Sequence, residues 1–100
     1  MASRDDFQTL LESILGSDEV YFQPPSNIEM SYPAITYTRR FNNSFADNKV
    51  YSQAKRYNVI VMDKNPDSPI VEAISKLPTC TFITHYASDN INHDVFEITY

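Results

Sequence analysis

The side chains best suited to chemistry in this 100-residue chain are one cysteine and two histidines, Cys80, His85 and His93. A cysteine acts as a nucleophile when a base lies within hydrogen-bond reach and a further group orients that base. Cys80 and His85 stand an odd number of positions apart on a predicted strand, so strand alternation predicts that they point to opposite faces. His93 and Asp94 are expected to point apart for the same reason. The spacing therefore argues against catalysis and favours a buried, inert cysteine.

The two histidines, with Asp89 and Asp94, could instead bind a metal if the rings faced each other across a hairpin. The spacing follows no ligand motif, and a pair of solvated histidines accounts for it more simply. Asp63 and Asp67 flank a loop that lacks the spacing and central glycine of a calcium site, and this loop fits turn and helix-capping chemistry. We therefore expect neither a metal nor a cofactor.

Glycine occurs once, at Gly16. Phosphate-binding loops, dinucleotide fingerprints and the nucleophile elbow each need several glycines, because the backbone must turn tightly or approach a ligand closely. This scarcity excludes all three motifs. The sequence consequently predicts a protein that is not an enzyme.

The length predicts one domain, 1–100, with a modest hydrophobic core. No run of apolar residues is long enough to span a membrane, and the early acids of the N-terminus do not fit a secretory signal. A single cysteine, Cys80, allows neither a disulfide framework nor a cysteine-based zinc site within the chain. We expect a small soluble domain in a reducing, intracellular compartment.

Charge is unevenly distributed along the chain. The net charge is -5, which disfavours general or sequence-specific binding of nucleic acid. Residues 36–58 nevertheless contain five basic residues against one acidic residue, Asp47, while acids predominate elsewhere. A basic segment on an acidic body is electrostatically complementary between copies of the chain, although a solvated charge pattern is an alternative interpretation.

Hydrophobic spacing and turn residues predict an α+β domain, in which two helices pack on one face of an antiparallel sheet of about four to five strands. Ser3 and Gly16 should begin and end a helix over 3–15. Ser68 and Pro69 should begin a second helix that ends before Pro78. The predicted strands cover 20–22, 34–41, 49–62, 79–87 and 93–100, the last two as an antiparallel hairpin.

Alternation also predicts which strand side chains share a face. Tyr57, Val59 and Val61 should face one way and Ile60 and Met62 the other, so the C-terminal half of strand 49–62 should be buried on both faces. In the last hairpin, Cys80, Phe82, Thr84 and Tyr86 should share one face of the first strand. Phe96, Ile98 and Tyr100 should share one face of the second strand.

The strand over 49–62 is longer than the domain needs. About 14 residues extend roughly 45 Å, whereas a domain of this size has a radius of gyration near 13 Å. The sequence therefore predicts a long projecting hairpin over 36–58, with a loop at 42–48. An isolated ribbon is marginally stable in water, so a neighbouring subunit should cover it. A shorter strand that bends at a bulge is the alternative.

The predicted hairpin supplies the candidate interface residues. Arginine and aromatic side chains dominate interface energetics. Charge pairing with acidic residues of another subunit is expected from Arg39, Arg40, Lys55 and Arg56, and apolar anchoring from Phe41, Phe45 and Tyr51. Stacking of this basic and aromatic set on single-stranded nucleic acid is a weaker alternative for a chain of negative net charge.

The sequence also resembles a family of small proteins from long-tailed phages and prophages, encoded among the head–tail joining and tail genes. The likeness covers the whole chain and is most specific in the segments FQPP, MSYP, DKNPDS and DNINHDVF. The family is similar to tail-terminator and tail-completion proteins. The resemblance implies a homo-oligomeric, hexameric ring that caps the tail tube and joins it to the head–tail connector proteins.

The same resemblance implies a structural protein of the virion tail or neck, assembled in the bacterial host cytoplasm, with no catalytic residues. Two other roles stay open from the sequence. One is a head-side connector or stopper subunit. The other is a small adaptor that binds peptides at an exposed sheet edge. An enzyme with an unusual site at Cys80 or His85 is the least expected.

Overall fold

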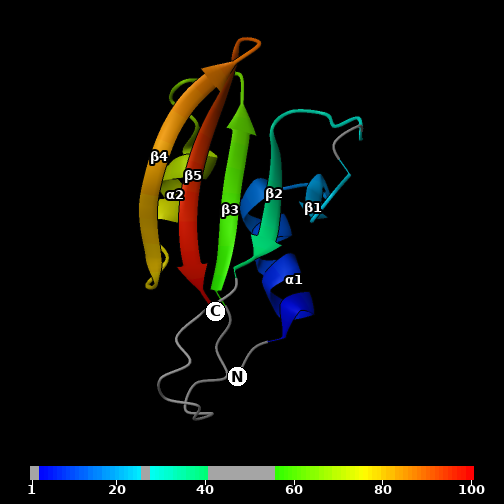
Figure 1. The fold of residues 1–100 in the computed structure, drawn as a ribbon, viewed down its shortest axis with the longest axis vertical. Helices are drawn as coiled ribbons and strands as arrows, with labels where there is room; N and C mark the ends of the chain where they lie inside the picture. Colours follow the sequence, from blue (N-terminus) through cyan, green and yellow to red (C-terminus); the bar gives the residue numbers. More distant parts are fainter. Residues whose placement is uncertain (1–2, 26–27, 41–55) are drawn as a thin grey trace.

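The computed structural model describes residues 3–25, 28–40 and 56–100. Figure 1 shows their arrangement as an α+β fold, a sheet with both helices behind it. In chain order the elements are α1 (Arg4–Leu15), β1 (Val20–Phe22), β2 (Ala34–Arg39), β3 (Arg56–Asp63), α2 (Pro69–Ser75), β4 (Cys80–Ser88) and β5 (Ile91–Thr99).

The described strands form a five-stranded sheet in the order β1-β2-β3-β5-β4. β2, β3, β5 and β4 pair antiparallel, but β1 pairs parallel with β2, with Val20 opposite Ile35. The prediction of a purely antiparallel sheet was therefore wrong, and the sheet is mixed. The two strands run the same way (Figure 1) because the Ile35 N–H donates to the Glu19 carbonyl and the Gln23 N–H donates to the Tyr37 carbonyl, each at 2.9 Å, which holds them in a parallel register.

The local signals at the helix ends are confirmed. Ser3 and Asp6 form a reciprocal capping box, in which the Asp6 N–H donates to Ser3 Oγ and the Ser3 N–H donates to Asp6 Oδ2, each at 3.2 Å. Gly16 ends α1 in the left-handed conformation, with φ of 84°. Ser68 Oγ accepts from the Ile70 N–H at 3.2 Å, and Pro69 takes the first position of α2.

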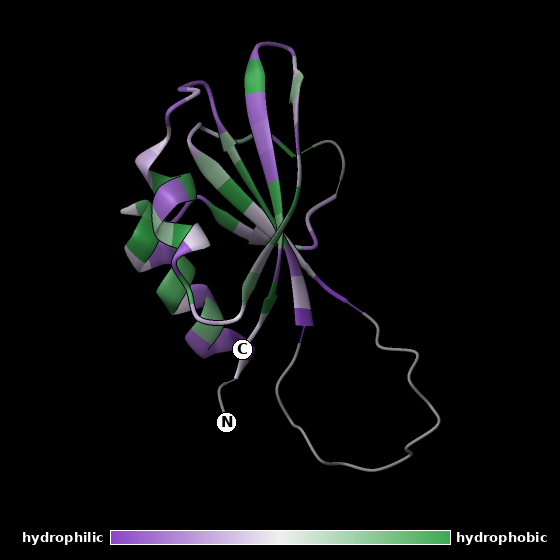
Figure 2. Cartoon of the chain, turned by 90° about the vertical axis from the view of Figure 1, so that its left-hand side faces the viewer, coloured by the Kyte–Doolittle hydropathy of each residue, from purple (hydrophilic) through white to green (hydrophobic). Residues whose placement is uncertain are grey.

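Both helices pack on one face of the sheet (Figure 2). Phe7 and Leu11 of α1 and Ile74 of α2 are fully buried against side chains of β2, β3 and β5. Burial of these apolar surfaces is the main force that holds the layers together. The strand contribution to this core comes from Val20, Ile35, Tyr37, Tyr57, Val59, Val61, Phe96 and Ile98.

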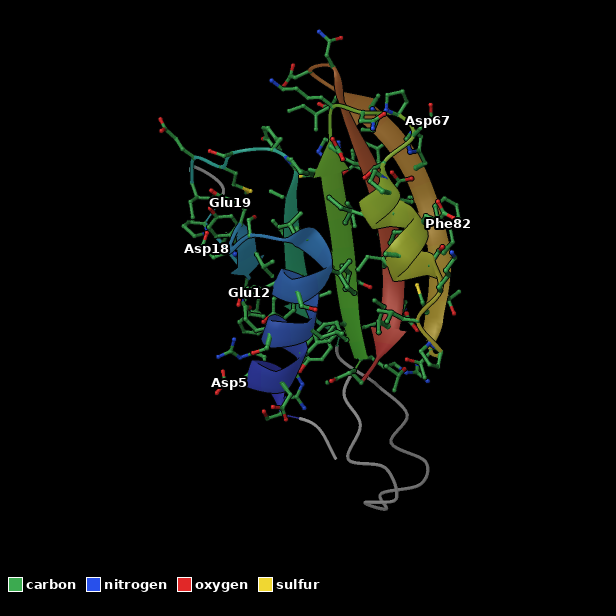
Figure 3. All side chains as sticks on the ribbon, turned by 180° about the vertical axis from the view of Figure 1, so that it is seen from behind. Asp5, Glu12, Asp18, Glu19, Asp67 and Phe82 are labelled. Atoms are coloured by element: carbon green, nitrogen blue, oxygen red, sulfur yellow. The ribbon has the colours of Figure 1, made fainter. Side chains whose placement is uncertain are left out.

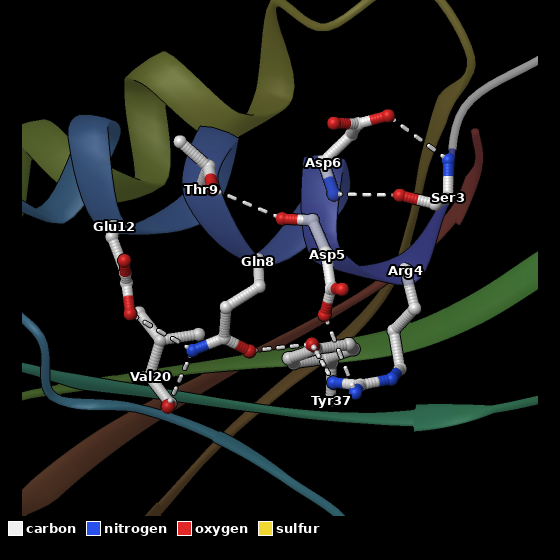
Figure 4. Close-up of polar contacts among 9 residues, drawn as sticks. All are labelled: Ser3, Arg4, Asp5, Asp6, Gln8, Thr9, Glu12, Val20 and Tyr37. Atoms are coloured by element: carbon white, nitrogen blue, oxygen red, sulfur yellow. Dashed lines mark hydrogen bonds and ion pairs between the residues drawn. The ribbon is translucent and has the colours of Figure 1, made fainter.

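A polar network also joins α1 to the edge of the sheet (Figure 4). The Tyr37 hydroxyl donates to Gln8 Oε1 at 2.5 Å, and Gln8 Nε2 donates to the Val20 carbonyl at 2.9 Å. The Arg4 guanidinium lies 4.6 Å from the centre of the Phe22 ring. These contacts fix the short strand β1 and β2 against the helix.

The lengths predicted for the strands over 34–41 and 49–62 are tested only in the described residues. β2 ends at Arg39 and β3 begins at Arg56. The outer part of the predicted hairpin 36–58, including the loop 42–48, lies outside the described residues. Within β3, the helix-facing residues are buried as predicted, and Met62 is buried on the other face. Ile60 on that face is only half-buried, so burial on both faces is incomplete.

The last hairpin forms as predicted, but β4 contains a bulge. Phe82 pairs with Phe96 and Thr84 pairs with Val95, so Ile83 is an extra residue in β4. Alternation reverses at this residue. Cys80 and Phe82 lie on the helix face, whereas Thr84 and Tyr86 lie on the opposite face. The prediction that these residues share one face was therefore wrong, because the bulge inserts one position into the ladder.

Candidate protein-interaction surfaces

Two of the predicted interface arginines meet one glutamate on the sheet face that the helices leave open. Arg40 Nε lies 3.1 Å from Glu97 Oε2, and Arg56 Nη1 lies 4.0 Å from Glu97 Oε1. The Arg40 N–H also donates to the Arg56 carbonyl at 2.7 Å, which continues the β2–β3 ladder by one residue. Both arginine side chains are 48% exposed. This exposure leaves the guanidinium groups accessible. Ion pairs as exposed as these contribute at most about 1 kcal/mol to stability.

Arg39 is placed differently. It is opposite Tyr57, whose side chain faces the helices, so strand alternation directs Arg39 to the helix side of the sheet. Its backbone N–H donates to Gln23 Oε1 at 3.3 Å, and the residue is exposed. The predicted basic set is thus divided between the two faces at one end of β2 and β3. Phe41, Phe45, Tyr51 and Lys55 lie outside the described residues.

Sequence reasoning missed Glu97 as a partner of the arginines. The alternation in β5 does carry a signal, because Phe96 and Ile98 face the core and Glu97 must face outward. Its position opposite Asn58, beside Arg56, depends on the register of β5 against β3. That register is a tertiary property, and the strand pattern alone does not specify the neighbour.

The other surface that sequence reasoning missed is the edge of the sheet at β4. Among the described residues β4 pairs only with β5, so one side of its backbone is not bonded within the sheet. Phe82, Ile83 and Tyr86 are 56%, 50% and 46% exposed. The signal was present in the sequence TCTFITHYA, which has strong β propensity, but the pattern did not show that this strand is an edge.

The bulge also changes the relation between the candidate catalytic residues. Cys80 is opposite Ile98 and His85 is opposite Asp94, and both partners lie on the same face of β5. The prediction that Cys80 and His85 point to opposite faces was therefore wrong. They are still separated by most of a strand, roughly 16 Å at about 3.3 Å per residue. A direct Cys–His hydrogen bond is excluded by that separation.

His85 instead contacts an acid. Its Nδ1 lies 2.8 Å from Asp94 Oδ1, and the histidine side chain is 46% exposed. His93 lies opposite Tyr86 on the other face, where the two rings stack at 4.6 Å. The two histidine rings therefore do not face each other. Across the described part of the chain, no three histidine, cysteine, aspartate or glutamate residues gather as a metal site would require.

Cys80 is partly buried, and this burial raises the pKa of its thiol. The thiolate is the reactive form, so a raised pKa lowers reactivity at neutral pH. We expect the folded chain to react several-fold more slowly with a disulfide reagent such as DTNB than the same chain unfolded in urea. Absorbance of the released thiolate measures both rates. An equal or faster rate in the folded chain would instead identify an activated cysteine.

Neither helix within the described residues is long and apolar enough to cross a membrane. No protein-family model, curated protein or solved structure matches this chain.

Proposed function

We propose that this protein is a structural subunit of the head–tail junction of a long-tailed phage, and that it forms a ring as a tail terminator or tail-completion protein. The resemblance of its sequence segments to that family supports this role. The role requires surfaces that bind neighbouring subunits, and it requires no catalytic group.

The observation that carries the proposal is the separation of charge over the surface. Arg39, Arg40 and Arg56 lie together at one end of β2 and β3, and Glu97 neutralises only part of their charge. The labelled acids Asp5, Glu12, Asp18 and Glu19 lie along α1 and beside β1 (Figure 3).

Basic and acidic areas at different places on one chain suit a head-to-tail contact between copies. Such a contact forms a closed ring when the rotation between neighbours permits it. The tail tube protein and the head–tail connector proteins are the partners on the two sides of the ring.

Binding to purified tail tubes tests this proposal. We expect the chain to sediment with tail tubes, and the double variant Arg39→Glu with Arg40→Glu to bind at least about tenfold more weakly. Loss of an interface arginine that acts as a hot spot costs about 2 kcal/mol or more. The matched control is Lys64→Glu with Lys76→Glu, which makes the same charge change at exposed positions elsewhere.

Light scattering completes the test. A chain that is monomeric at high concentration and also fails to sediment with tail tubes would refute the ring role. Unchanged binding by the arginine variant would remove the arginines from the interface.

A second candidate is an adaptor that binds an extended peptide at a sheet edge, which the free edge of β4 favours. A head-side stopper would use the same kind of surfaces. Imaging of the labelled protein in virions separates these roles by its position: at the end of the tail, on the head side, or absent from the particle.

A further inference from the structure

The exposed strand β4 has the properties of a pairing edge. It extends over nine residues, Cys80–Ser88, and forms one edge of the sheet. Its outer N–H and C=O groups are a template for a further strand. Proteins usually protect such an edge with lysine, proline or a bulge. β4 contains no lysine, arginine, acid or proline, and its only such device is the bulge at Ile83.

Large apolar side chains concentrate on this edge. Of the four large apolar residues that are exposed in the described chain, three belong to β4, namely Phe82, Ile83 and Tyr86. Figure 3 shows Phe82 at the β4 edge of the sheet, across the molecule from Asp5 and Glu12 of α1. Phe82 lies on the helix side of β4 and Tyr86 on the open side, so exposed apolar groups line both sides of this one edge, as at an interaction surface.

We propose that β4 pairs with β4 of a second copy of this chain, antiparallel, and so extends the two sheets into one. The contact is isologous and closes at a dimer. It does not depend on the ring role proposed above, and it uses neither the arginine cluster nor the acidic side of α1.

Charge selects a second copy as the occupant. β4 carries no formal charge apart from what His85 can take up, so two copies of the strand meet without opposing like charges. The acids of α1 and of the segment just before β1 lie toward the opposite edge of the sheet, so a contact through β4 keeps the acidic sides of the two copies far apart (Figure 3). Such separation reduces the repulsion between two copies of a chain whose net charge is -5.

Charge also selects the antiparallel direction. Asp89 lies in the turn directly after β4 and is exposed. Parallel alignment would place the two copies of Asp89 side by side, and antiparallel alignment places them at opposite ends of the contact. Antiparallel pairing is also the arrangement that twofold symmetry produces, and Thr, Phe, Ile and Tyr are strong strand formers.

The test combines the oligomeric state with backbone protection. A single strand-to-strand contact is smaller than a standard interface, so we expect a concentration-dependent dimer with a dissociation constant roughly between micromolar and millimolar. Sedimentation measures it. Amide hydrogen exchange should show that alternate N–H groups of β4, those that do not bond to β5, become protected as the dimer forms.

Two variants should weaken the dimer at least tenfold without unfolding the chain. Each variant, Ile83→Lys or Tyr86→Lys, places a positive charge at an exposed position of β4. Because the dimer is twofold symmetric, each contact then contains two such charges, one from each copy. Ser13→Lys is the matched control, because it adds the same charge at an exposed position of α1. Circular dichroism confirms that each variant keeps its fold.

Three results would overturn the proposal. One is a monomer over the whole concentration range. Another is a dimer that persists in both lysine variants or leaves the β4 amides unprotected. The third is protection of β4 only after tail tube protein is added, which would assign the edge to a different partner. Tube binding by the lysine variants reports separately on the ring role.

Discussion

Replacement of Phe7 by alanine is expected to lower the free energy of unfolding by about 3–5 kcal/mol, the usual cost of removing a buried phenylalanine ring. The Phe7 ring is fully buried and lies between three tyrosines. Ring centres are 4.6 Å apart with Tyr57, 5.0 Å with Tyr100 and 5.4 Å with Tyr37. The variant therefore loses a buried ring and three aromatic contacts that help to hold α1 on the sheet.

This loss is a large share of the 5–15 kcal/mol that stabilises a typical domain. A shift of 4–8 °C per kcal/mol is usual for a domain of this size, so the melting temperature should fall by about 12 °C or more. Urea unfolding followed by circular dichroism measures the change in free energy.

Phe82→Ala is the matched control for Phe7→Ala. The same atoms are removed, but Phe82 is 56% exposed and its only aromatic contact among the described residues is with Phe96, at 5.6 Å. We expect a loss of about 1.5 kcal/mol or less. Equal losses in the two variants would contradict the placement of Phe7 at the centre of the core.

Replacement of Ile74 by alanine is expected to cost about 2–5 kcal/mol. Ile74 is fully buried and, with Ile70, fixes the seven-residue helix α2 to the sheet. A helix this short has little stability of its own, because nucleation is costly and few bonds follow it. The alanine variant should therefore loosen α2 before the sheet unfolds. Hydrogen exchange should show a greater loss of protection at α2 amides than at β3 amides.

The matched control for Ile74→Ala is Ile83→Ala, in which an isoleucine that is 50% exposed is removed from the bulge of β4. We expect its free energy of unfolding to change by less than about 1 kcal/mol. If Ile83→Ala destabilises the chain as much as Ile74→Ala, the Ile83 side chain contributes to the stability of the fold as a core residue does, which would contradict its exposed position.

Local signals in the sequence predicted most of the elements, because the residues that cause them are adjacent. Ser3 with Asp6, Gly16, and Ser68 with Pro69 act within one turn of the backbone, and the helix ends lie where these residues place them. The β-branched and aromatic runs likewise predicted the described strands and the β4–β5 hairpin.

The features that the sequence did not predict depend on contacts between distant residues. The parallel pairing of β1 with β2, and the position of β5 between β3 and β4, follow from how the strands pack around Phe7 and Ile74. The bulge at Ile83 adds one position to β4 with no glycine or proline to mark it, so simple alternation gave the wrong face for Tyr86. Similarly, Glu97 reaches Arg40 and Arg56 only through the strand order.

The candidate site was predicted in part. Arg39, Arg40 and Arg56 lie at one end of the sheet because β2 and β3 pair antiparallel. Neighbouring residues of a strand point to opposite faces, so Arg39 and Arg40 are divided between the two faces. The prediction of one basic set did not take this alternation into account. The sequence did not show that β4 is an edge strand, because this depends on the order of the strands in the sheet.

The extra residue in β4 determines how anything can reach that edge. In an uninterrupted strand, side chains four positions apart stand above the same face, and Phe82 and Tyr86 would form a single ridge there. With Ile83 inserted, one ring projects on the helix side and the other on the open side. A chain that approaches is thus flanked by aromatic rings above and below, which favours entry in the plane of the sheet over stacking on it.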